Sequence, residues 1–160
     1  KLPEERFSGI KVVVTGIMTE PEALLDAFDE NGIAIVADDL AHESRQFRTC
    51  AGNGRTALEK LALRMTEQKC ALLYDQEKTR GQMLIDLVEE TGASGVVVSM
   101  MKFCDPEEFD YPIYRKELGD AHIPTLYLEI EQKMDSIEPI RTRIQSFAEM
   151  IQGGKDVFRN

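Results

Sequence analysis

The chain alternates between short runs of apolar residues and longer segments in which apolar residues recur at helical spacing. Four apolar runs have the length and composition of buried strands, and they lie at residues 11–17, 33–37, 95–100 and 123–130. Runs that are apolar on both faces are typical of parallel strands covered by helices on each side. The sequence therefore predicts a parallel sheet of at least four strands.

Apolar residues at helical spacing fill most of the chain between and after these runs. They predict five helices, which lie between residues 19 and 31, over 56–66, 77–90 and 106–118, and around a final stripe of Ile140, Ile144, Phe147 and Ile151. Two segments lack this spacing. Residues 38–55 are predicted to form a long loop, with or without a short stretch of helix. Cys70–Tyr74 is either an edge strand or an extended connection, of which we favour the connection.

Strands that alternate with helices indicate an α/β fold in which right-handed crossovers wind a parallel sheet on both faces. We expect the spatial order second, first, third, fourth, as in flavodoxin-like and Rossmann-like sheets. In that order the chain reverses direction between the first and third strands, and ligands bind beyond their carboxyl ends. Gly16 and the segment Lys102–Cys104 are predicted to face this crevice together.

Length and composition agree with one globular domain. A chain of 160 residues buries enough surface for a single core without disulfides. We expect that domain to span residues 9–152, preceded by a polar linker at 1–8 that leads from a domain absent here. Gly153-Gly154 is expected to begin a loose tail at 153–160.

The charge and cysteine content exclude several classes of partner. A formal net charge of −10 argues against binding to nucleic acid or to an anionic membrane surface. No apolar run approaches the ~20 residues of a membrane span. Three cysteines, at positions 50, 70 and 104, form neither a disulfide framework nor a zinc motif. A reducing cytoplasm is therefore the expected location.

Cys104 is the most informative single residue, because it lies between a buried strand and a helix start. The helix start is Asp105-Pro106-Glu107-Glu108, with a capping side chain, an early proline and acidic residues near the dipole's positive end. Free helical N–H groups favour a thiolate that ligates a metal or attacks a substrate, whereas three neighbouring carboxylates oppose it. A small, buried, inert cysteine is the alternative.

Other polar residues each have two interpretations. Asp38-Asp39 either orients a ligand or forms a turn after the second strand. Ser44 and Arg45 either hold a phosphate or carboxylate of a substrate or anchor the long loop through a salt bridge. Gly16 lacks the spacing of a phosphate-binding loop and is predicted to permit a turn. His42 and His122 are predicted to be solvated loop residues.

Several motifs together resemble one enzyme family. Lys-Phe-Cys-Asp-Pro at 102–106, followed by Phe-Asp-Tyr-Pro at 109–112, is similar to the C-terminal half of the 2-hydroxyacyl-CoA dehydratase and benzoyl-CoA reductase family. The resemblance extends to Val-Val-Val-Thr-Gly at 12–16, Ala-Asp-Asp-Leu at 37–40 and Ile-Arg-Thr-Arg-Ile at 140–144. These motifs occur in family order over nearly the whole chain.

The resemblance implies a dimer of two related subunits, each with a [4Fe-4S] cluster held by three cysteines, and a separate ATP-hydrolysing activator protein. In the dehydratases one low-potential electron reduces the thioester carbonyl of a 2-hydroxyacyl-CoA to a ketyl radical anion. This radical expels the 2-hydroxyl group and leads to an enoyl-CoA. In the benzoyl-CoA reductase branch the electron goes to an aromatic ring, and that branch, or another ATP-dependent reductase of the same family, is the nearest alternative. A homodimeric relative that carries a different cluster and reduces small molecules is also left open.

The resemblance assigns Cys104 to the third cluster ligand of the family. The other two ligands belong to the family's N-terminal part, and Cys50 and Cys70 do not match them, so this chain alone is expected to hold no cluster. Gly16, Ser44, Arg45 and Lys102 are weaker candidates for contact with the acyl-CoA substrate. Glu138-Pro139 departs from the family pattern. A flavodoxin-like binding module with an inert Cys104 is the non-enzymatic alternative.

Overall fold

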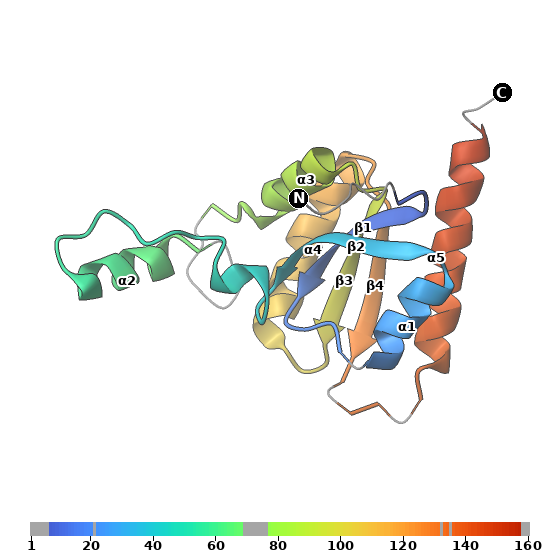
Figure 1. Ribbon diagram of the computed structural model, residues 1–160, viewed down its shortest axis with the longest axis horizontal. Helices are drawn as coiled ribbons and strands as arrows, with labels where there is room; N and C mark the ends of the chain where they lie inside the picture. The colour runs from blue at the N-terminus through green and yellow to red at the C-terminus, as the bar shows by residue number, and fades with distance from the viewer. Residues whose placement is uncertain (1–6, 21, 69–76, 132, 135, 158–160) are drawn as a thin grey trace.

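The computed structural model describes residues 7–20, 22–68, 77–131, 133–134 and 136–157. Its centre is a sheet of four parallel strands, ordered β2-β1-β3-β4, as Figure 1 shows. The strands are β1 (Ile10–Gly16), β2 (Ile33–Leu40), β3 (Gly95–Met101) and β4 (Thr125–Ile130). The predicted α/β class and the predicted strand order are both confirmed.

Helices cover both faces of this sheet. One core lies under α1 (Glu22–Glu30) and α5 (Glu138–Val157), and the other under α3 (Arg80–Thr91) and α4 (Asp105–Asp120). Successive residues of a strand point to opposite faces, so Val12 and Val14 enter the first core while Val13 enters the second. This double burial explains why the strands are apolar throughout.

Several boundaries differ from the predicted ones. Strand β2 continues past Ala37 to Leu40, and α5 continues through Gly153 and Gly154 to Val157. The expected end of the last helix before Gly153 is therefore wrong. Glycine has a low helix propensity. Both glycines are exposed with open space around them, so their missing side chains cost no packing contacts in addition. The segment Cys70–Tyr74 lies outside the described residues.

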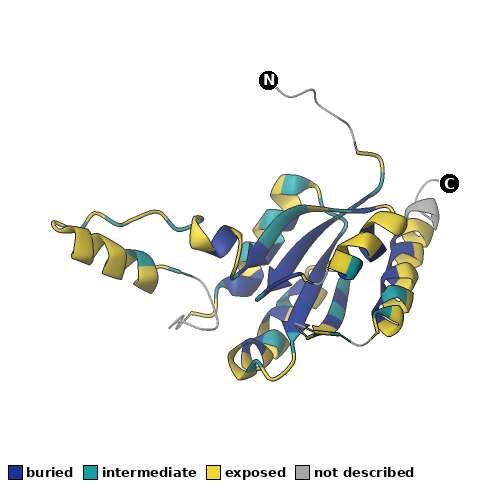
Figure 2. Cartoon of the chain, turned by 60° about the horizontal axis from the view of Figure 1, so that its bottom comes forward, coloured by how far each residue is buried: buried dark blue, intermediate teal, exposed yellow. Residues whose placement is uncertain are grey.

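The long loop after β2 is partly ordered by local structure. It contains a short 3-10 helix, η1 (Ser44–Gln46), and leads to α2 (Ala57–Thr66), which begins and ends close to the predicted positions. Figure 1 shows α2 well away from the sheet, and Figure 2 shows that its surface is exposed. Within the described ranges, no helix is both long and apolar enough to cross a membrane.

Candidate functional site

The carboxyl ends of β1, β2 and β3 meet at one edge of the sheet. Gly16 is paired with Leu40 on one side and Ser99 on the other. Its φ of 144° and the position of the Ser99 carbonyl oxygen, 2.1 Å from where a Cβ would stand, exclude any other residue. Gly16 therefore permits a close approach of two strands, which is a different role from the predicted turn.

Cys104 lies at the same edge, three residues after β3 ends. Its backbone N–H donates to the Met101 carbonyl oxygen at 3.2 Å, and its own carbonyl oxygen accepts from Glu108 at 3.0 Å. Phe103 precedes it with a φ of 65° and a 91% exposed side chain. Cys104, and not Asp105, is the N-cap of α4, and its free thiol makes no capping hydrogen bond. Cys104 is only partly buried, so it is not the fully buried core residue of the alternative interpretation.

The first turn of α4 contributes one carboxylate to the interior. Glu107 is only 1% exposed, and its Oε1 accepts from Arg45 Nη1 at 2.9 Å. Arg80 Nη2 lies 2.7 Å from its Oε2, and the Arg80 guanidinium also stacks over the ring of Tyr114, 5.0 Å from the centroid. Two cations therefore neutralise one of the three carboxylates that were expected to oppose a thiolate at Cys104.

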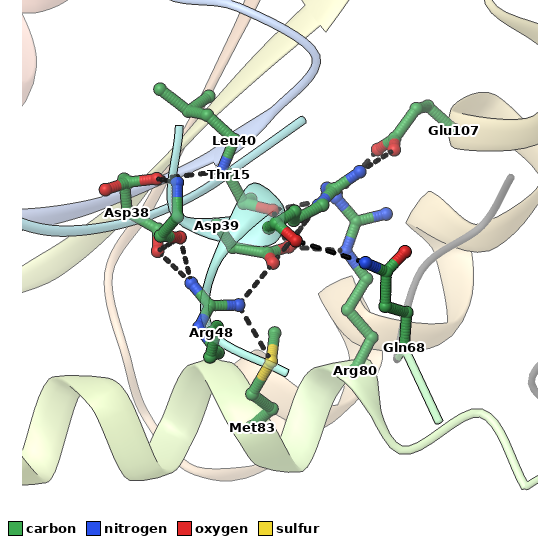
Figure 3. Close-up of polar contacts among 11 residues, drawn as sticks. Thr15, Asp38, Asp39, Leu40, Arg48, Gln68, Arg80, Met83 and Glu107 are labelled. Carbon is green, nitrogen blue, oxygen red and sulfur yellow. Dashed lines mark hydrogen bonds and ion pairs between the residues drawn. The ribbon is translucent and has the colours of Figure 1, made fainter. Parts of the chain in front are cut away.

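Asp39 is the centre of a buried ionic network, drawn in Figure 3. Its carboxylate is fully buried and accepts from Thr15 Oγ1 at 2.9 Å, from Arg45 Nε at 3.1 Å and Nη2 at 3.0 Å, and from Arg80 Nε at 3.0 Å. Arg48 Nη1 adds a contact at 2.7 Å. This one side chain therefore connects β1, β2, the following loop and the start of α3.

The network keeps Asp39 ionised. Burial by itself raises the pKa of Asp39, but the charges of Arg80 and Arg45, with hydrogen bonds from Arg45 and Arg48, outweigh it and hold the pKa below its ordinary value of 3.8. Burial and the charge of Arg45 by themselves lower the pKa of Arg80. The charges of Asp39 and Glu107 outweigh them and raise the pKa of Arg80 above its ordinary value. The buried charges are thus compensated by each other.

Residues 2–151 match the family described as 2-hydroxyglutaryl-CoA dehydratase, D-component. The chain belongs to this family.

Three relatives show where the chain stands within the D-component family. It is 48% identical over 151 residues to the lactoyl-CoA dehydratase subunit beta of Anaerotignum propionicum, covering 93% of this chain and 40% of the relative. It is 44% identical over 145 residues to the (R)-phenyllactyl-CoA dehydratase beta subunit of Clostridium sporogenes, covering 91% and 39%. Identity to one of the benzoyl-CoA reductase subunits of Thauera aromatica is 23% over 157 residues, covering 95% and 41%. The chain thus spans about 40% of the length of these relatives.

Two residues considered for substrate contact, Ser44 and Arg45, make contacts that anchor the loop after β2. Ser44 Oγ donates to the Asp38 carbonyl oxygen at 2.7 Å, and Asp38 Oδ1 accepts from the backbone N–H groups of Leu40 and Ser44, both at 3.0 Å. Arg45 is buried against Asp39. Of the two interpretations of Asp38-Asp39, a turn after the second strand is wrong, because both residues belong to β2. In this member of the D-component family, Ser44 and Arg45 therefore make the contacts that the loop-anchoring interpretation describes.

Lys102 lies at the same edge but faces a different hollow. Its Nζ is 2.5 Å from Glu131 Oε1, which raises the pKa of Lys102. It lines a cavity of about 350 Å³ beside the end of β4, together with Lys133 and Arg143. His42 and His122 are both exposed, as predicted.

Sequence reasoning missed most of the network around Asp39. Arg80, Thr15 and Arg48 lie far apart in the sequence and carry no local signal, and Glu107 was interpreted only as a helix-start acid. Among the described residues, no group of three or more histidine, cysteine and acidic side chains is placed to hold a metal ion, and Cys50 is exposed. Neither of the two described cysteines, Cys50 and Cys104, belongs to such a group.

Proposed function

We propose that this chain is part of a subunit of an iron–sulfur-dependent 2-hydroxyacyl-CoA dehydratase. The observation that carries the proposal is its identity of 48%, 44% and 41% to three dehydratase beta subunits, each over nearly the whole chain. Identity to the benzoyl-CoA reductase subunit is about half of that, which favours the dehydratase over the reductase branch.

The proposal assigns Cys104 to one thiolate ligand of a [4Fe-4S] cluster. Cys104 is a free, partly buried cysteine at the N-cap of a sixteen-residue helix, and cysteine sulfur is the usual ligand of iron–sulfur clusters. The remaining ligands must then come from parts of the complete subunit beyond the described residues. When bound, the cluster supplies a low-potential electron to the substrate thioester.

The residues of this chain fix the position of that ligand. Glu107 follows Cys104 by three residues, and its ion pairs to Arg45 and Arg80 hold the first turn of α4 against the loop after β2 and the start of α3. Because Arg45 and Arg80 are both paired with Asp39, the turn is joined to the sheet itself. Such supporting contacts keep a metal ligand in place when the cluster is absent.

The proposed partners follow from the same assignment. They are a related second subunit, an ATP-hydrolysing activator protein and the acyl-CoA substrate, in the cytoplasm, with no nucleic acid and no membrane. Relatives named as beta subunits support an assembly of unlike subunits. The net charge of −10 supports the exclusion of nucleic acid.

An assay of the complete subunit with its partner and activator tests the function. Under anaerobic conditions with ATP, we expect conversion of a 2-hydroxyacyl-CoA, such as lactoyl-, phenyllactyl- or 2-hydroxyglutaryl-CoA, to the enoyl-CoA. No reduction of benzoyl-CoA is expected in the same mixture. Ring reduction without dehydration would move the protein to the reductase branch, and activity on neither class would contradict both assignments.

Reconstitution of this 160-residue chain alone tests the ligand count. Anaerobic incubation with iron and sulfide, followed by desalting, is expected to leave well under one iron per chain, because a single thiolate exposes most iron sites to solvent. The measurement is iron content together with the visible absorption spectrum. Stoichiometric iron with a cluster spectrum would show that Cys50 or Cys70 also ligates.

A further inference from the structure

The guanidinium of Arg80 is buried with one of its nitrogens outside the ionic network. Arg80 is only 2% exposed and reaches from the start of α3 toward Asp39, as Figure 3 shows. Its Nε donates to Asp39 at 3.0 Å, and its Nη2 lies 2.8 Å from Thr15 Oγ1 and 2.7 Å from Glu107 Oε2. Among the described residues, Nη1 has no hydrogen-bond partner. Because a guanidinium is a rigid planar fork, Nη1 points to a different side from the other two nitrogens.

Tyr114 of α4 contributes a second polar group of the same kind. It is 1% exposed, and the Arg80 guanidinium lies over its ring, 5.0 Å from the centroid. Its hydroxyl has no hydrogen-bond partner within the described part of the chain. Burial raises the pKa of Tyr114 above its ordinary value of 10.0, so the hydroxyl keeps its proton at neutral pH and can both donate and accept. Two buried groups in contact with each other therefore each need a further partner.

A small cavity is lined by both of these side chains. Its volume is about 10 Å³, and its lining consists of Lys78, Arg80, Asp110, Ile113 and Tyr114. A cavity of that size has room for about one water molecule. Lys78 Nζ lies 2.8 Å from Asp110 Oδ1, so an ion pair completes the polar part of the lining.

The charges around the cavity favour an uncharged occupant. Arg80 and Lys78 would repel a cation, and the Asp110 carboxylate would repel an anion. These charges are also compensated, because Lys78 pairs with Asp110 while Arg80 pairs with Asp39 and Glu107. No ion is therefore needed to balance them. A neutral molecule that can both accept and donate hydrogen bonds is the occupant that suits a guanidinium, a hydroxyl and a carboxylate together.

The polar lining belongs to one face of α4. Glu107, Asp110 and Tyr114 are separated by three and four residues, the spacing of neighbours on a helix surface. This face lies against the start of α3, where Glu107 pairs with Arg80 and Asp110 with Lys78. The cavity therefore lies within the polar contact between the two helices that cover this side of the sheet.

We infer that this cavity is a binding site for one buried water molecule, which accepts a hydrogen bond from Arg80 Nη1 and bonds to Tyr114 Oη and the Asp110 carboxylate. Three partners are typical of a buried water. The water extends the attachment of α4 to α3 from the ion pair at Glu107 along the following two turns. The site is a property of the fold and does not depend on the proposed enzymatic function.

A high-resolution crystal structure of the complete enzyme tests the inference. We expect one ordered density peak about 2.7–3.2 Å from both Arg80 Nη1 and Tyr114 Oη, in crystals grown without added halide. A second crystal is soaked in sodium bromide, and we expect no anomalous peak at this place because the surrounding charges are balanced. A bromide peak, the absence of any density or a protein side chain in the cavity would each overturn the inference.

Removal of one hydroxyl gives a measurement in solution. Tyr114→Phe keeps the ring under Arg80 but deletes one hydrogen-bond partner of the water. We expect the melting temperature of the complete subunit to fall by about 1–3 °C, because the buried water then loses a bond that nothing replaces. An unchanged or higher melting temperature would show that the hydroxyl has no partner and would contradict the water site.

Tyr127→Phe on β4 is the matched control. Its half-buried ring packs against Tyr111, and it does not line the cavity. The same loss of a hydroxyl is expected to change the melting temperature by less than about 1 °C. An equal fall in both variants would assign the effect to the loss of any tyrosine hydroxyl and would also overturn the inference.

Discussion

Replacing Asp39 by alanine is expected to lower the free energy of unfolding by about 3–5 kcal/mol, a large part of the stability of a domain of this size. The carboxylate is fully buried and accepts hydrogen bonds from Thr15, Arg45, Arg48 and Arg80. Its removal leaves Arg45 and Arg80 buried with a single carboxylate, Glu107, between them. The measurement is urea unfolding at neutral pH, followed by circular dichroism.

An exposed ion pair in the same molecule provides the control. Asp120 pairs with Lys116 one turn away on α4 at 2.6 Å, and both side chains are largely exposed. Replacing Asp120 by alanine is expected to change the free energy of unfolding by less than about 0.5 kcal/mol, because water screens such pairs. If the Asp39 variant were no less stable than the Asp120 variant, the network would not be a stabilising feature.

The pH dependence of stability follows from the same carboxylate. Because the pKa of Asp39 is lower in the folded chain than its ordinary value of 3.8, its contribution is present above that value and is lost as the pH falls through the folded pKa. The difference in unfolding free energy between the unmodified chain and Asp39→Asn should therefore be constant from about pH 5 to 7 and shrink below about pH 4. A difference that grew in acid would contradict the depressed pKa.

Replacing Cys104 by serine in the complete enzyme is expected to abolish cluster binding and reduce dehydration more than about 100-fold. A hydroxyl is a far weaker iron ligand than a thiolate, and even contacts beyond the ligands commonly alter metal affinity about 10–100-fold. Folding should change little, because the thiol makes no capping hydrogen bond and is only partly buried. Iron content, turnover and thermal unfolding are measured on one preparation.

Cys50→Ser is the matched control for this variant. Cys50 is free and exposed, and no motif or described contact assigns it to a cluster, so iron content and turnover are expected to stay within about twofold of the unmodified enzyme. Should the Cys104 variant retain its iron and turnover, the assignment of the third ligand fails. A flavodoxin-like binding module would then describe this domain better than a dehydratase subunit.

The sequence by itself determined the sheet and its covering helices. Apolar runs such as Gly95–Met100 and stripes such as Ile140 to Ile151 carry a period that depends only on local geometry, and the crossover rule then orders the strands. The motif around Cys104 also indicated the family without any structure. These features can be predicted from the sequence because each depends on residues that are neighbours in the chain.

Only the tertiary structure decided what the polar residues do. Asp39 pairs with Arg80, which lies 41 positions away, and Glu107 pairs with Arg45, which lies 62 positions away. No local pattern predicts such partners. The exposure of Cys104 and of the apolar residues of α2 could not be predicted either, because spacing predicts that a helix face is apolar but not what covers it. Burial and charge compensation depend on the whole fold, so they become visible only when distant segments are brought together.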